Sequence, residues 1–153
     1  MKPLLVLLVT SLIALLVIFF VKNQWNFTLA ARIGMAAMLV FTAIGHFAFT
    51  KGMVLMMPEF LPYKQPLVYA TGVLELIAAI GLLVPATTTL TGWFLLIFFL
   101  LLLPANIKAA VEHIDYQKAT YDGSGSYYLW FRIPLQVLFM VWVYMCAISH
   151  ALQ

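Results

Sequence analysis

Residues 89–111 read TLTGWFLLIFFLLLLPANIKAAV, and this stretch decides the class of fold. It contains one charged side chain, Lys108, near its C-terminal end. A helix that crosses a membrane needs about 20 mostly apolar residues, because the hydrocarbon layer is about 30 Å thick and each helical residue rises about 1.5 Å. The stretch is therefore long enough and apolar enough to span a membrane.

Four further stretches have the same character. They are residues 3–21, 29–50, 66–84 and 128–149. Of the 153 residues, 65% are hydrophobic and 8% are charged, whereas an ordinary soluble domain has roughly 25% charged residues. The stretches do not alternate strictly between apolar and polar residues, which favours helices over the strands of a barrel. We expect an all-α integral membrane helical bundle.

The first stretch is expected to be an anchor helix. It ends in Phe19-Phe-Val-Lys22, which offers no small-residue cleavage site for a secretory signal, so we interpret it as retained. Residues 1–25 then form an N-terminal transmembrane anchor, and residues 26–153 form an antiparallel four-helix transmembrane domain. Glycine and alanine residues in the second and third stretches predict that these two helices pack closely.

The distribution of Lys and Arg predicts the orientation in the membrane. Six of them fall on one side: Lys2, Lys51, Lys64, Lys108, Lys118 and Arg132. Only Lys22 and Arg32 fall on the other. Because cytoplasmic loops carry an excess of positive residues, we expect a cytoplasmic N-terminus and an outside C-terminus in the cell (inner) membrane. The formal net charge is only +3 and no basic run contains interleaved aromatic residues, so the expected partner is the lipid bilayer and not nucleic acid.

The connections between the stretches carry two further expectations. Residues 51–65 are too apolar to stand in water and too interrupted by proline to span, so they are expected to lie at the membrane interface. The threonines at 87–89 are expected to cap the following helix.

Cysteine and histidine limit the possible chemistry. Cys146 is the single cysteine and lies in the last stretch, so an intrachain disulfide or a CxxC pair is excluded. A bis-histidine haem site would need His46 with His113, and nothing else in the sequence supports it. A zinc site lacks a ligand set, so no metal is expected.

Five polar side chains interrupt the apolar stretches at similar depth. Counted from the cytoplasmic ends at about 1.5 Å per residue, they are His46 (about 6 Å), Glu75 (about 13 Å), Asn106 (about 10 Å), Arg132 (about 6 Å) and Gln136 (about 12 Å). Every stretch except the first contributes at least one of them. A charged side chain at the centre of a spanning helix costs about 2.5 to 3.5 kcal/mol, so each needs a partner or a purpose. We expect them to surround a common polar pocket.

The roles of these five residues remain open at the level of sequence. Glu75 either pairs with a cation such as Arg132, binds a ligand or a proton, or is a neutral acid. Arg132 shares a helix face with Gln136 and either holds Glu75 or an anionic head group, or extends to the interface. His46 is a proton acceptor, a hydrogen-bond donor to quinone, a metal ligand or a packed side chain. Asn106 either bonds to backbone freed by Pro104 or bonds across helices.

Several short motifs occur in a characteristic order. They are Gly45-His46-Phe47, the loop from Pro58 to Pro62, Gly72-x-x-Glu75 with Gly81-Leu-Leu-x-Pro85, Pro104-Ala-Asn106, and Arg132-x-Pro134-x-Gln136. With these motifs the chain from about Leu29 onward resembles the DoxX and DoxX-like membrane protein family. The resemblance implies a four-helix membrane bundle in a bacterial inner membrane, to which the anchor helix is an addition.

The resemblance also implies a class of function. Some DoxX-type proteins are named for a subunit of a thiosulfate:quinone oxidoreductase, and others associate with oxidant-defence enzymes, which implies quinone as the cofactor and a membrane or peripheral protein as partner. The first hypothesis is therefore a quinone-linked oxidoreductase subunit. The alternatives are a non-catalytic binder or carrier of a small lipophilic or anionic molecule, and a structural or assembly partner of a membrane complex. The sequence leaves open whether the chain is an enzyme.

Overall fold

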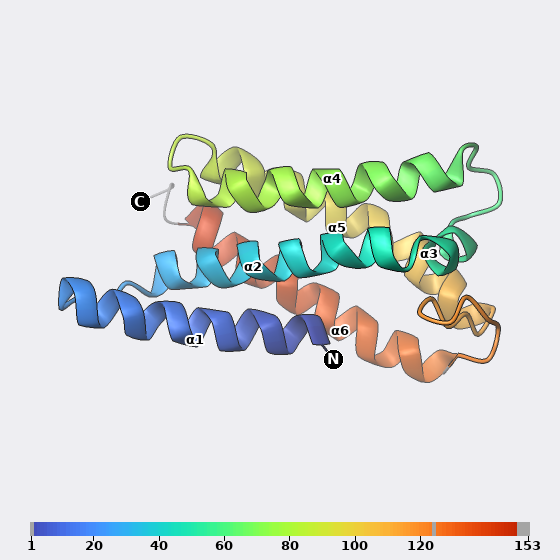
Figure 1. Ribbon diagram of the computed structural model, residues 1–153, viewed down its shortest axis with the longest axis horizontal. Helices are drawn as coiled ribbons and strands as arrows, with labels where there is room; N and C mark the ends of the chain where they lie inside the picture. The colour runs from blue at the N-terminus through green and yellow to red at the C-terminus, as the bar shows by residue number, and fades with distance from the viewer. Residues whose placement is uncertain (1, 124, 150–153) are drawn as a thin grey trace.

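A computed structural model describes residues 2–123 and 125–149, and these residues form a bundle of long helices (Figure 1). The helices are α1 (Lys2–Lys22), α2 (Phe27–Ala48), α3 (Thr50–Met56), α4 (Lys64–Leu83), α5 (Thr88–Val111) and α6 (Ser126–Val143), and α6 continues into a π-helical turn, η1 (Tyr144–Ile148). The described part of the chain contains no strand beyond an isolated bridge between Asp115 and Thr120. The predicted all-α fold is confirmed.

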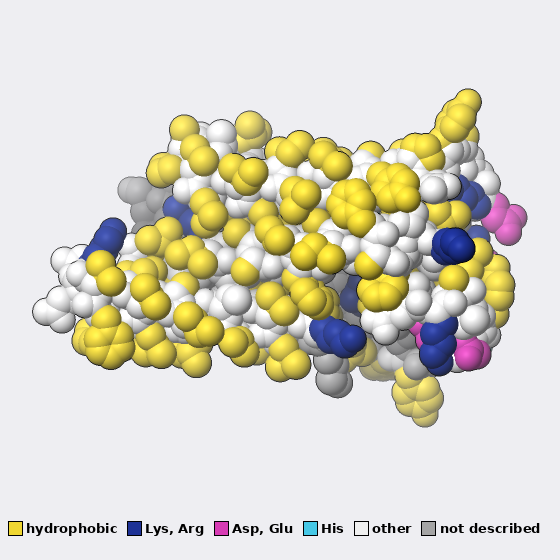
Figure 2. Space-filling view, viewed as in Figure 1, with side chains coloured by type: hydrophobic (Ala, Val, Ile, Leu, Met, Phe, Trp, Pro, Cys, Tyr) yellow, Lys and Arg dark blue, Asp and Glu magenta, His cyan; other side chains and the backbone are white. Residues whose placement is uncertain are grey.

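Five helical segments are long and apolar enough to cross a membrane. They are α1, α2, α4, α5 and the segment Leu129–Ile148, which joins most of α6 to η1. The helices agree with the five predicted stretches to within two residues at each end. Figure 2 shows apolar side chains spread over the visible flank of the bundle, as expected where lipid replaces water. The chain is therefore a multi-pass membrane protein.

The core of the bundle consists of α2, α4, α5 and α6, which run alternately in opposite directions (Figure 1). Its fully buried side chains include Met35, Leu39, Leu82, Leu95 and Val143. The additional helix α1 packs along α2 and contributes Leu7 to the same cluster. The predicted arrangement of a four-helix core with one extra N-terminal helix is confirmed.

We call the end of the bundle that carries α3 the α3 end. There α2 leads into α3 with almost no break, and the hydroxyl of Thr50 donates to the carbonyl of His46 at 2.7 Å. The ammonium of Lys108 donates to the carbonyl of Met57 at 3.0 Å, which ties the chain after α3 to α5. The segment 51–65, expected only to lie at the interface, thus forms a short helix followed by a non-helical strap.

The loop between α5 and α6 is also at the α3 end and is the most polar part of the described chain. Its Asp122 accepts a hydrogen bond from the Thr120 hydroxyl. This hydrogen bond, assisted by the nearby charge of Lys118, lowers the pKa of Asp122. At the opposite end of the bundle lies the short turn between α4 and α5; residues 150–153, which carry the C-terminus that the sequence predicts to be outside, are beyond the described residues.

Helix α1 is shifted along the bundle relative to α2. Its N-terminal end lies beside the middle of the bundle, and its other end projects past the α4–α5 turn (Figure 1). Lys2 therefore lines an internal cavity and does not lie with Lys51 and Lys64 at the α3 end. Counting charges along the sequence grouped these lysines together, because it assumed that α1 begins level with the ends of its neighbours.

Close approach between the helices depends on glycines. A Cβ atom on Gly72 would lie 2.9 Å from the Cβ of His46, so the glycine allows α4 to pack against α2. The predicted contact between these two helices is confirmed at this point. Gly34 instead faces Ser11 of α1, and Gly81 faces Thr91 of α5.

The threonines before α5 do not cap it as predicted. The hydroxyl of Thr87 donates to the carbonyl of Gly81 at 3.0 Å, and that of Thr88 donates to the carbonyl of Val84 at 2.9 Å. They satisfy the C-terminal carbonyls of α4, which have no partner within their own helix.

Candidate functional site

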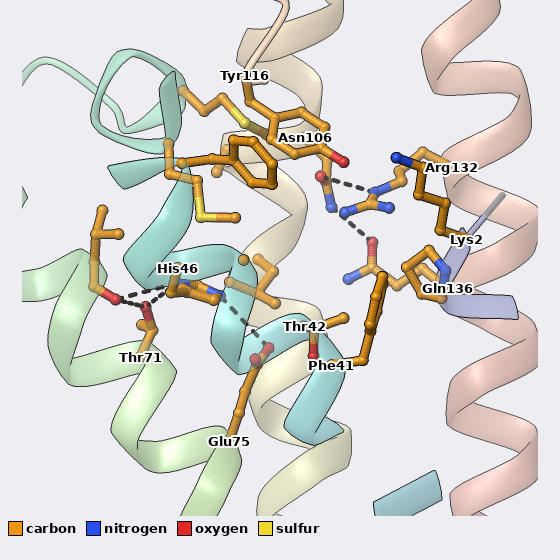
Figure 3. A pocket seen from close by; sticks show the side chains of 18 of the residues that line it. Lys2, Phe41, Thr42, His46, Thr71, Glu75, Asn106, Tyr116, Arg132 and Gln136 are labelled. Atoms are coloured by element: carbon orange, nitrogen blue, oxygen red, sulfur yellow. Dashed lines mark hydrogen bonds and ion pairs between the residues drawn. The ribbon is translucent and has the colours of Figure 1, made fainter. Parts of the chain in front are cut away.

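A cavity of about 820 Å³ lies between the core helices, next to the α3 end (Figure 3). The five polar residues predicted to share a pocket all line it: His46, Glu75, Asn106, Arg132 and Gln136. Most of the remaining wall is apolar, with aromatic, aliphatic and methionine side chains from α2, α3, α5 and α6. The structure therefore brings the predicted set together, as two separate groups of interacting side chains.

The first group joins α2 to α4. Nε2 of His46 lies 3.6 Å from Oε1 of Glu75. Nδ1 of the same ring lies 3.1 Å from the carbonyl oxygen of Val68 and 3.0 Å from the hydroxyl of Thr71. Figure 3 shows His46 between Thr71 on one side and Glu75 on the other. The imidazole is thus held at both ring nitrogens.

Glu75 is deeply buried. The residue is 4% exposed, and its Oε2 atom has no hydrogen-bond partner among the described residues. An ionised carboxylate in such a place is costly unless a charge and hydrogen bonds compensate it. His46 is the group that the structure places beside it.

The second group joins α5 to α6. The amide nitrogen of Asn106 donates to Oε1 of Gln136 at 3.1 Å, and Nε of Arg132 donates to Oδ1 of Asn106 at 3.4 Å. The amide of Gln136 also donates to the backbone carbonyl of Phe99 on α5. Both amide side chains are buried, so this chain of bonds fixes α6 against α5.

The partners differ from one sequence-based interpretation. Glu75 is paired with His46 rather than with Arg132, while Arg132 donates to Asn106. Both Arg132 and Glu75 line the same cavity, but they belong to different groups on different helices. Asn106 bonds across helices, which is one of the two roles that the sequence left open.

A family model described as a domain of unknown function, DUF8561, matches residues 35–147. The chain belongs to the DUF8561 family. The match begins within α2 and ends within η1, so it includes all five predicted site residues and leaves α1 outside. No curated protein matches the chain, and neither does any solved structure.

Sequence reasoning missed five further polar residues that line this cavity, two of which are Thr42 of α2 and Gln117 of the loop before α6. Lys2 reaches the cavity from α1, Thr71 from α4 and Tyr116 from the loop before α6. Thr71 was detectable in principle, because it lies four residues before Glu75 and so shares its helix face. Lys2 and Tyr116 carried no such signal, because their positions depend on how α1 and the loop pack on the domain.

Proposed function

We propose that this DUF8561 protein is a DoxX-like membrane protein whose cavity binds the polar head group of a lipophilic molecule, with quinone as the leading class. The observation that carries the proposal is the gathering of five buried or half-buried polar residues around one otherwise apolar cavity. Its volume of about 820 Å³ is within the range of roughly 300–1,000 Å³ that is common for small-molecule sites. Quinone itself comes from the resemblance to DoxX-type proteins, which is an argument by analogy.

The arrangement suits a molecule with a polar ring and an apolar tail. The guanidinium of Arg132 can donate to the acceptors of a quinone ring, and the apolar wall accommodates the tail. In this proposal the electrons reach the quinone from a separate membrane or peripheral protein. The chain is then the quinone-binding subunit of an oxidoreductase.

The route that we propose from the bilayer to the cavity passes between α2 and α6. These helices are joined near the end opposite α3, where Arg32 Nε donates to the carbonyl of Cys146 at 2.6 Å and Trp142 Nε1 donates to that of Ala31 at 3.1 Å. They diverge toward the α3 end (Figure 1). We infer that a lipophilic ligand enters sideways from the membrane, under the cover of α3 and the strap held by Lys108.

A thermal-stability assay tests the proposal. Purified protein in lipid nanodiscs is heated with and without a short-chain benzoquinone, and native mass spectrometry of freshly extracted protein looks for a retained quinone. We expect stabilisation of the wild type, and weaker stabilisation of Arg132→Gln and His46→Gln. Lys118→Gln, in the exposed loop, is the matched control and should respond like the wild type. The absence of both retained quinone and stabilisation would overturn the quinone proposal.

A second candidate is a lipophilic anion, and a specific observation favours it. Lys2 and Arg132 lie on the same wall of the cavity (Figure 3), whereas the carboxylate of Glu75 is on the opposite side beside His46. A carboxylate or phosphate head group would be attracted to this wall. Two results together would favour this candidate over quinone. A long-chain carboxylate should stabilise the protein where the benzoquinone does not, and this stabilisation should be weaker in Lys2→Gln.

We also propose that the α3 end faces the cytoplasm of a bacterial cell and that the C-terminus is outside. Lys51, Lys64, Lys108 and Lys118 are at or near this end, while Lys22 and Arg32 are toward the other. A Cys146→Ala background carrying either Lys118→Cys or Asn23→Cys tests the orientation with a thiol reagent that does not cross membranes. In intact cells only Asn23→Cys should react, and the reverse pattern would contradict the proposed orientation.

A further inference from the structure

The pair formed by His46 and Glu75 has hydrogen-bonding requirements that depend on where its protons are. The first is set at Nδ1 of His46, which faces two oxygens. One is the backbone carbonyl of Val68, at 3.1 Å, which can only accept. The other is the hydroxyl of Thr71, at 3.0 Å, which itself donates to the Val68 carbonyl at 2.8 Å and so turns a lone pair to the ring. Nδ1 therefore carries a hydrogen.

The second requirement is at Nε2 of His46. A neutral imidazole has a single N–H, so a hydrogen on Nδ1 leaves a lone pair on Nε2. That lone pair would face Oε1 of Glu75 at 3.6 Å, in a place where the two side chains are 12% and 5% exposed. An ionised carboxylate and a lone pair repel each other there. One additional proton removes the conflict, either on Nε2, which gives an ion pair, or on Oε1, which gives a neutral pair.

The unpartnered oxygen of Glu75 supports the same conclusion. Its Oε2 atom is buried and has no partner among the described residues. An ionised carboxylate spreads negative charge over both oxygens, whereas a protonated acid can leave Oε2 as an uncharged carbonyl oxygen at lower cost. The pair is thus built to hold a proton between its members.

The other titratable groups around the cavity are few. Lys2 reaches it from α1, Arg132 from α6 and Tyr116 from the loop between α5 and α6. Among the described residues, the lining side chains of α3 and α5 are not titratable, and α5 contributes the amide of Asn106. The two cations attract an anion into the cavity, where it would lie near the pair.

We propose that His46 and Glu75 form a membrane-buried proton-binding site, which holds one proton and donates it to the anion of a lipophilic weak acid bound in the cavity. The donation rests on the proposed function, because it needs a ligand in the cavity. In that step the N–H bond at Nε2 or the O–H bond at Oε1 breaks, and an O–H bond forms on the ligand. His46 is left neutral, Glu75 is left ionised, and no electron moves.

The proton is tested first without any ligand. Protein with ¹⁵N-labelled histidine is reconstituted in nanodiscs, and His46→Gln identifies the signals of this ring among the three histidines of the chain. Infrared spectra of the wild type, Glu75→Gln and the control Glu59→Gln, an exposed carboxylate of the strap, locate a carboxylic acid band.

We expect Nδ1 of His46 to be protonated together with one of two signs of the additional proton. These are a protonated Nε2, or an acid band that disappears in Glu75→Gln and remains in Glu59→Gln. Two results would overturn the proton-binding site. One is a neutral ring with its hydrogen on Nε2. The other is a neutral ring with its hydrogen on Nδ1 in a protein that shows no acid band.

The donation is tested with a long-chain carboxylic acid and the alcohol of the same chain length. Above about pH 6 the acid dissolved in water is ionised, because carboxyl groups in water have pKa values near 4. Because only the protonated pair can donate, the affinity for the acid should then fall with rising pH, by up to tenfold per pH unit for one linked proton. Affinity for the alcohol should be independent of pH.

The variants separate the possible failures. His46→Gln and Glu75→Gln should flatten the pH dependence of acid binding, whereas Glu59→Gln should retain it. Variants that bind the acid with the wild-type pH dependence would overturn the donation. If neither the acid, the alcohol nor a benzoquinone binds the wild type, the proposed function fails, and the donation fails with it. The spectra alone still decide whether the pair holds a proton.

Discussion

Thr71 links the imidazole of His46 to the backbone of α4. Thr71→Val keeps the shape of the side chain and removes the hydroxyl from Nδ1 of His46. We expect a loss of about 1 kcal/mol in the free energy of unfolding, the usual size for one hydrogen bond, measured by denaturant unfolding in lipid nanodiscs. Thr42→Val is the control, because the Thr42 hydroxyl donates only within its own helix, to the carbonyls of Met38 and Leu39. Equal losses in both variants would contradict the role of Thr71.

Asn106 and Gln136 form a buried amide pair that is suited to a double-mutant cycle. We expect Asn106→Leu and Gln136→Leu each to destabilise the protein, and the double variant to lose less than the sum, because a single substitution leaves one buried amide without its partner. In membrane proteins such coupling is about 0.6 kcal/mol on average and reaches about 1.7 kcal/mol. Unfolding free energies of the four proteins measure it.

A second cycle controls for effects that are not specific to the contact. Asn106→Leu is combined with Thr42→Val, because the Thr42 hydroxyl donates to the carbonyls of Met38 and Leu39 within α2. Their effects should add to within about 0.5 kcal/mol. Additivity in the Asn106 and Gln136 cycle as well would contradict a direct bond between the amides.

The five polar residues of the cavity were predictable as a set, but their partners were not. Depth in the membrane follows from counting residues along a helix of fixed rise, so a common layer is legible in the sequence. The partner of Glu75 depends on how α2 and α4 rotate about their axes and which helices are neighbours. The sequence suggested Arg132, and the approach of α4 to α2 at Gly72 makes it His46.

At the scale of helices, Gly72 controls that approach. Gly72→Ala would place a Cβ atom 2.9 Å from the Cβ of His46, so the helices must separate. We expect a loss of about 1 to 3 kcal/mol in unfolding free energy, typical of overpacking, and a weaker effect of Glu75→Gln in this background. The control is Gly45→Ala, whose Cβ would meet only the methyl group of Met53 at 3.7 Å. Because alanine favours helix, Gly45→Ala should be neutral or stabilising, and a similar loss in both would contradict the packing argument.

The spanning helices were predicted to within two residues, whereas the connections between them were not. A membrane requires about 20 apolar residues in a row, and few other patterns satisfy that condition. The helix α3 is too short to show a periodic pattern, and the hydroxyl of Thr50 helps to continue the chain from α2. The hydroxyls of Thr87 and Thr88 donate backward to the carbonyls of Gly81 and Val84 and so do not act as N-caps of α5.

The whole molecule combines a closed end with an open one. Near the α4–α5 turn, hydrogen bonds from Arg32 and Trp142 hold α2 against the terminal helix. Toward the α3 end the same helices diverge, and the polar groups of four helices meet in the space between them. The charged side chains and the cavity therefore lie in the same half of the bundle. Lys2 reaches that half only because α1 is shifted along the bundle.

That shift makes α1 separable from the DUF8561 domain. Deletion of residues 1–25 should leave α2 to α6 folded, because the family match covers residues 35–147 and because lipid can replace α1 with little loss of apolar solvation. Gly34, which packs against Leu7 and Ser11 of α1, would then face hydrocarbon. We expect monodisperse protein in detergent with a slightly lower melting temperature, measured by size-exclusion chromatography and thermal unfolding.

The long-chain carboxylate should bind to the truncated protein more weakly and the matching alcohol equally well, because Lys2 is lost. Lys2→Gln in the full chain should reproduce the change in affinity without the change in melting temperature. Aggregation of the truncated protein would contradict the prediction and show that α1 is part of the folding unit.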